Sequence, residues 1–148
     1  MVIVRNDLLD SVIKIRDDSA LPAERMFSVF QKAIYDAANI LGVPVTTKEL
    51  EYCEEGRLAS FVPGHTEKCF VVYNPEHPNW MRFICTIHCL GNVNYYEFYQ
   101  LSYGVKLPAA QTDLASSLLG KVKLFNNSDR NRKYWEMELS RIIAEIND

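Results

Sequence analysis

The sequence predicts an α+β fold, an antiparallel sheet of about four to five strands in a meander, flanked by two helices. An N-terminal helix is expected at about 22–41 and a C-terminal helix at about 129–146, because apolar residues recur there at helical spacing. Between them, alternating apolar and polar residues are separated by proline- and glycine-rich turns, which is typical of consecutive strands. The chain is predicted to form a single domain over 1–148.

The N-terminal helix has the clearest pattern. Pro22 suits a first helical turn, and Gly42 and Pro44 end the helix. The C-terminal helix follows a capping sequence at 127–129. The apolar stripes that both helices must bury are Met26, Phe27, Phe30, Ala33, Ile34, Ala37, Ala38 and Leu41 in the first, and Tyr134, Trp135, Leu139, Ile142, Ile143 and Ile146 in the second.

Shorter elements fill the rest of the chain. Apolar spacing at 8–13 favours a short helix within the first 18 residues. Short strands are expected at 57–62 and 68–73, on either side of a turn. After Gly104, a short helix at 108–119 and an edge strand at 121–125 are expected.

Residues 79–103 predict a long hairpin that turns at Gly91 and Asn92. A two-residue loop pairs Ile87 with Tyr96, whereas a four-residue loop pairs Cys85 with Tyr99. The two registers place opposite faces of the second strand against the first, and both stay open. The side chains that share the apolar face of the first strand are Met81, Phe83, Cys85, Ile87 and Cys89.

The hairpin carries more aromatic residues than one sheet face needs. If both helices cover one face, about half of these rings lie on the other, where they form an interface or are covered by residues 1–18 and 104–125. Both alternatives stay open. The aromatic residues are Trp80, Tyr95, Tyr96, Phe98, Tyr99 and Tyr103.

Composition argues against several classes of protein. A net charge of −3 disfavours nucleic-acid binding, and no segment is apolar enough for a membrane span. The apolar stretch at the start of the sequence is too short for a signal peptide, and charged residues follow it too soon. The protein is therefore expected to be cytoplasmic. Cys85 and Cys89 would lie about 13 Å apart on one strand, which favours reduced thiols over a disulfide or a metal site.

Catalytic signatures are missing from the sequence, and neither an enzymatic activity nor a cofactor is expected. His65 and His77 fall in turns, and the acidic run around Tyr52 is interpreted as a solvated face. A basic cluster between Lys121 and Lys133 gives only a weak case for an anionic partner.

The first functional hypothesis is a non-enzymatic interaction module, chaperone- or adaptor-like, that forms a homodimer through its aromatic sheet face or binds another protein. The order of helix, strands and helix is similar to that of secretion-chaperone-like folds, which bind protein segments as dimers; this similarity concerns the fold and no motif carries it. The predicted binding residues are Trp80, Arg82, His88, Tyr95, Tyr96, Tyr99 and Tyr103.

The second hypothesis is a small-molecule-binding or hydrolytic protein with a site around Arg82, His88 and Glu97. Arg82 and His88 share one face of their strand. Glu97 joins that face only if the hairpin has a two-residue loop, in which case it lies opposite Thr86.

Overall fold

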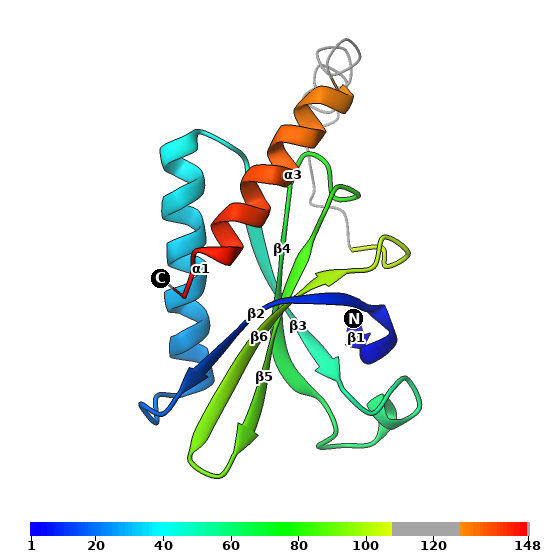
Figure 1. The fold of residues 1–148 in the computed structure, drawn as a ribbon. Coiled ribbons are helices and arrows are strands. Elements are labelled where there is room, and N and C mark those ends of the chain that lie inside the picture. Colours follow the sequence, from blue (N-terminus) through cyan, green and yellow to red (C-terminus); the bar gives the residue numbers. More distant parts are fainter. Residues whose placement is uncertain (108–127, 148) are drawn as a thin grey trace.

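Six strands form one mostly antiparallel sheet, and two helices pack on one of its faces (Figure 1). The computed structural model describes residues 1–107 and 128–147. The predicted α+β class is confirmed, although the sheet has six strands where about four to five were expected. The elements are β1 (Val2–Val4), the 3₁₀ turn η1 (Arg5–Asp7), β2 (Leu8–Asp17), α1 (Ala23–Leu41), β3 (Thr46–Cys53), the 3₁₀ turn η2 (Ala59–Phe61), β4 (Glu67–Tyr73), β5 (Phe83–Leu90), β6 (Val93–Leu101) and α3 (Ser128–Ala144).

The strand order is β1-β3-β4-β5-β6-β2. Strands β3 to β6 form the predicted meander, while β1 pairs in parallel with β3 and β2 pairs antiparallel with β6. Two strands that follow each other in the chain therefore lie at opposite edges of the sheet, joined only by η1.

This connection forces the sheet to curl. Six strands laid flat would separate the edges by roughly 24 Å. The chain from Val4 to Leu8 spans at most about 14 Å when fully extended. Both ends are fixed, because Val4 pairs with Cys53 and Leu8 pairs with Leu101. The sheet must therefore curl on the side away from the helices, so that its two edge strands approach each other near η1.

The hairpin of β5 and β6 has the two-residue loop. Leu90 pairs with Val93, and Ile87 pairs with Tyr96. Gly91 has φ of 60°, which a type II′ turn requires at its first central position and which glycine adopts without strain. This register directs Tyr96 toward the helices and Tyr95 away from them, since neighbouring strand residues point to opposite faces.

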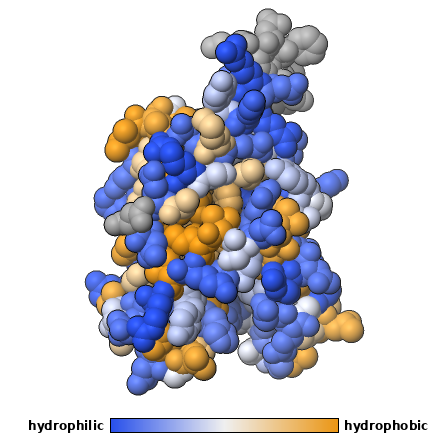
Figure 2. Space-filling model, viewed as in Figure 1, coloured by the Kyte–Doolittle hydropathy of each residue, from blue (hydrophilic) through white to orange (hydrophobic). Residues whose placement is uncertain are grey.

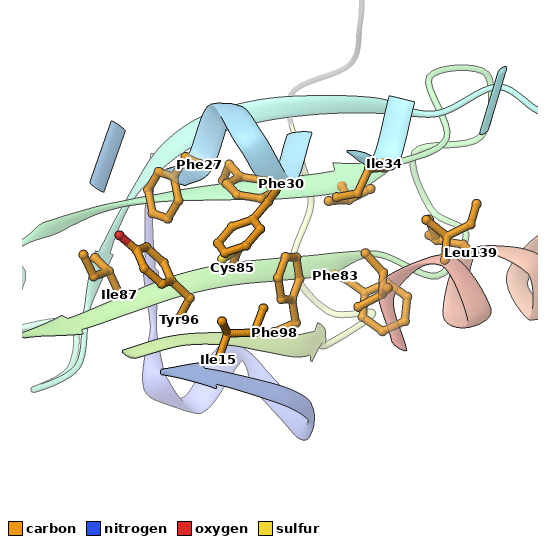
Figure 3. Close-up of a cluster of buried hydrophobic side chains, with 14 of the residues drawn as sticks. Ile15, Phe27, Phe30, Ile34, Phe83, Cys85, Ile87, Tyr96, Phe98 and Leu139 are labelled. Atoms are coloured by element: carbon orange, nitrogen blue, oxygen red, sulfur yellow. The ribbon is translucent and has the colours of Figure 1, made fainter. Parts of the chain in front are cut away.

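The larger core, called here the helix-side core, lies between the sheet and both helices. Phe30 of α1 packs edge-to-face on Tyr96 and Phe98, with ring centroids 5.2 and 5.9 Å apart. Figure 3 shows Tyr96 pointing from the sheet toward Phe27 of α1, and Leu139 entering from α3. Most of both predicted apolar stripes therefore packs on the sheet, whereas Ala33, Leu41 and Tyr134 are exposed. The buried members are Ile15, Phe27, Phe30, Ile34, Phe70, Val72, Trp80, Phe83, Cys85, Ile87, Tyr96, Phe98, Trp135, Leu139, Ile142 and Ile143.

A smaller core, called here the groove-side core, lies on the other face, at the end where the sheet closes. Ile3, Leu8 and Leu107 bring the N-terminal residues and the segment after β6 onto the sheet. One of the two predicted alternatives was that residues 1–18 and 104–125 cover this face. At the end where the sheet closes, Ile3, Leu8 and Leu107 do cover it. The remaining buried members are Tyr52, Cys69, Val71, Tyr73, Ile84 and Leu101.

Three local predictions were wrong. Residues 8–17 form strand β2, not a helix; two register shifts, between Leu8 and Ser11 and between Ser11 and Ile13, break its alternation and imitate helical spacing. Residues 57–62 form turns and η2 in place of a strand. Strand β3 was missed because its acidic residues were interpreted as a solvated face. The predicted elements at 108–119 and 121–125 lie outside the described residues.

The adjacent residues Tyr95 and Tyr96 test the register. Tyr96→Ala removes a fully buried ring from the helix-side core and should lower the free energy of unfolding by about 3–5 kcal/mol. Tyr95→Ala, on the half-buried opposite face, should cost about 1 kcal/mol or less. Urea unfolding of both variants measures the difference. A register shifted by one residue predicts the reverse order.

Candidate functional site

The sheet face opposite the helices is called here the free face. Beyond the groove-side core, it forms a polar groove with a volume of about 750 Å³. One cavity draws side chains from five strands and from the β3–β4 connection, so this part of the sheet is concave. Its size falls within the range of ligand sites. The lining residues are Lys14, Tyr52, Glu54, Glu55, Gly64, His65, Glu67, Thr86, Ile87, His88, Tyr95, Glu97 and Tyr99.

Strand pairing arranges the groove floor in two polar rows. His88 lies opposite Tyr95, and Glu67 of β4 lines the groove near His88. In the next row Thr86 lies opposite Glu97, and Glu97 lies opposite Lys14. Glu97 and His88 therefore share one face, as the two-residue loop predicted.

Glu97 is held by three neighbours. Its carboxylate accepts hydrogen bonds from the Ser11 hydroxyl at 3.0 Å and from the Tyr99 hydroxyl, and Lys14 Nζ lies 3.3 Å away. Burial raises the pKa of Tyr99, and the adjacent Glu97 raises it further. Tyr99 therefore remains a neutral phenol that donates to the carboxylate.

At the other end of the groove lies a cationic side chain of this protein, that of Arg5. Tyr52 donates its hydroxyl hydrogen bond to Glu54, and Arg5 Nε lies 3.9 Å from the Glu54 carboxylate. The Arg5 guanidinium also lies 5.0 Å from the centroid of the Tyr99 ring. A carboxylate and an aromatic ring thus hold one guanidinium between them.

Glu67 differs from these carboxylates. Within residues 1–107 and 128–147 no hydrogen bond or ion pair holds its side chain. Partial burial raises its pKa, and nearby His88 opposes the rise. Glu67 is the groove carboxylate whose charge is least compensated by the surrounding chain.

The structure separates the predicted binding residues. His88, Tyr95 and Tyr99 line the groove together. Tyr103 is exposed beyond it, with the Arg132 guanidinium 5.8 Å from its ring centroid. These four residues remain predicted binding residues.

The prediction that Trp80, Arg82 and Tyr96 lie on the free face was wrong, because all three are at most 7% exposed. Trp80 instead lines the second cavity described below. Trp80 and Tyr96 belong to the helix-side core. Arg82 donates hydrogen bonds to the backbone carbonyls of Val105 and, at 2.6 Å, Ser102. Arg82 therefore fixes the segment after β6, and the predicted cluster of Arg82, His88 and Glu97 does not form.

Sequence reasoning missed most of the groove's other polar residues. The acidic run at 49–55 was noted, but without β3 its side chains could not be assigned to faces. On β3, Tyr52 faces the groove while Glu51 points to the opposite face. The alternation of Leu50 and Tyr52 with charged residues was the available signal. Lys14 and Glu67 had no local signal, because only strand pairing brings them to the groove.

A second cavity of about 320 Å³ lies between α3 and the connection from β4 to β5. His77 stacks on Trp80 with ring centroids 4.0 Å apart and planes 7° apart, and Trp80 contacts Trp135. Burial lowers the pKa of His77, although Glu76 opposes this shift. Trp135 donates its indole hydrogen bond to the Pro44 carbonyl at 3.0 Å.

Other findings limit the chemistry of the described residues. All four cysteines are free, and no three histidine, cysteine or acidic side chains of 1–107 and 128–147 are grouped to hold a metal ion. Neither α1 nor α3 is long and apolar enough to cross a membrane. No family model, curated protein or solved structure matches this chain.

His77 should make stability depend on pH. Because its pKa is lowered in the folded state, the unfolded chain takes up the proton first as the pH falls below the ordinary histidine value of about 6.5. Acidification from about pH 7 to about pH 5 should therefore destabilise the protein more than it destabilises His77→Phe, which keeps a stacked ring. Urea unfolding at both pH values measures this, and equal losses would contradict it.

Proposed function

We propose that this protein is a non-enzymatic interaction module that binds a segment of a partner protein in the polar groove. The observation that carries the proposal is the position of the groove: it is the open part of a sheet face whose other end is packed, and exposed apolar side chains flank it. Such side chains beside a polar cavity are typical of protein-binding surfaces.

These apolar side chains belong to the connection between β3 and β4. The connection contributes Glu54, Glu55, Gly64 and His65 to the groove. Between them it exposes Leu58 (86%), Phe61 (77%) and Val62 (48%). Figure 2 shows hydrophobic surface at the lower right, where Figure 1 places this connection. Exposing apolar side chains to water to this degree costs free energy in the free protein. Burial of these side chains by a partner is therefore favourable.

The edges of the sheet are less suited to binding. β1 has only three residues, and β2 has two register shifts and carries Lys14 and Arg16. Short strands, bulges and lysine or arginine at an edge hinder pairing with another strand. A partner is therefore expected on the groove and not as an added strand.

A hydrolytic function receives less support. Thr86 supplies the aliphatic hydroxyl of the groove lining, and at 3.5 Å it donates to the backbone carbonyl of Glu97, which is not a general base. The small-molecule site predicted around Arg82, His88 and Glu97 loses Arg82, and of these three residues only His88 and Glu97 line the groove.

Selection from a phage-displayed library of random peptides tests the proposal. We expect peptides that bind the wild-type protein and lose most of their affinity for Tyr95→Ala, which removes a groove ring. Tyr134→Ala is the matched control, because Tyr134 is an exposed tyrosine of α3 beside the second cavity. Failure to select any peptide, or an equal loss with Tyr134→Ala, would contradict binding in the groove.

The homodimer expected from the sequence stays a prediction, and the groove makes one form of it unfavourable. A two-fold contact through this face would bring Glu67 and Glu97 of both copies together, and like charges repel. Light scattering over a range of protein and salt concentrations measures the mass. A value near twice 17.0 kDa that falls as salt is removed fits this contact. A mass of 17.0 kDa under all conditions would contradict a homodimer.

A further inference from the structure

The groove lining is acidic. It includes four glutamates and one lysine, a formal charge of −3 with both histidines neutral. The complete chain also has a net charge of −3. The formal charges of all other residues sum to zero, and they include Arg5 beside Glu54. With Arg5 counted, the groove keeps a charge of −2 and is an acidic surface that attracts a cationic partner.

The contacts of Arg5 provide an internal example of the chemistry. Its guanidinium lies beside the Glu54 carboxylate and over the Tyr99 ring, at 3.9 Å and 5.0 Å. Tyrosine rings attract cations through their faces, and a neighbouring carboxylate adds a charge interaction. The groove lining thus already accommodates one basic side chain.

Glu67 and Tyr95 provide a second carboxylate and a second tyrosine ring in the groove. Arg16 of β2 lies opposite Tyr95, but no lysine or arginine of the described residues pairs with Glu67. Glu67 of β4 lies near His88 of β5, and His88 pairs with Tyr95 of β6. In the described part of the chain, no ion pair neutralises Glu67, and partial burial raises its pKa. A cation bound near the Glu67 carboxylate and the Tyr95 ring would offset this desolvation cost, because an opposite charge favours the ionised carboxylate.

We propose that the segment bound in the groove is basic, with a lysine or arginine side chain between Glu67 and Tyr95 and an apolar side chain against Leu58 and Phe61. This inference rests on the proposed function and names the chemistry of its partner. The apolar contact distinguishes a peptide from a free polyamine, because a polyamine has no bulky side chain to cover these residues.

Binding of synthetic peptides tests the inference. The probe is a short fluorescein-labelled peptide that alternates lysine with leucine, and its matched control replaces each lysine with glutamine. Fluorescence anisotropy should detect saturable binding of the lysine peptide that weakens with added salt. The glutamine peptide should bind at least about fivefold more weakly.

Two variants of the protein locate the contact. Glu67→Gln should weaken binding of the lysine peptide about fivefold, the upper range for a partly exposed charge pair. Glu51→Gln is the matched control, since Glu51 is also an exposed β-strand glutamate but points to the opposite face. It should leave the affinity unchanged.

Several results would overturn the inference. These are equal weakening by both variants, equal binding of the glutamine peptide, the absence of saturable binding, or equal affinity for spermidine, which would identify a small cation as the occupant. Selection of neutral or acidic peptides that require Tyr95 would also overturn it while leaving the proposed function intact. If no peptide requires Tyr95, the proposed function itself fails.

Discussion

The three-residue connection between β1 and β2 is the constraint on which the shape of the sheet depends. It joins opposite edges, so the sheet has to curl. Asp7 stabilises this closure at two points: its carboxylate accepts the Val4 N–H at 3.0 Å, and its carbonyl accepts the Ser102 N–H at 2.8 Å. The same closure packs the groove-side core and leaves the groove open at the other end of that face.

Strand alternation gives the same residue type two different environments. Tyr96 and Tyr99 are close in the chain, yet Tyr96 is fully buried between α1 and the sheet, whereas Tyr99 is half-buried and donates its hydroxyl to Glu97. The helix-side ring contributes area and edge-to-face contacts. The groove-side ring combines an apolar body with a polar tip. The aromatic excess of the hairpin is therefore divided between the helix-side core and the polar groove.

The polar groups of the groove also depend on the packed parts of the fold. Arg82 donates hydrogen bonds to backbone carbonyls of the segment after β6 and so fixes that segment. The same segment supplies Leu107 to the groove-side core. Tyr99 packs against that core while its hydroxyl reaches Glu97. The packed end of the face thus fixes the side chains at the open end, and a rigid scaffold of this kind reduces the ordering that binding requires.

The sequence by itself determined both long helices, the hairpin and the fold class, because helical and strand periodicities, proline and glycine act over short distances. It also limited the register to two alternatives, of which the structure has the two-residue loop. Only the tertiary structure shows that residues 8–17 form an edge strand and that Glu67, His88 and Tyr95 line one groove. Lys14 and Glu97 are far apart in the chain, and only pairing of β2 with β6 brings them together. Such long-range pairing depends on the packing of the entire sheet, which no local pattern encodes.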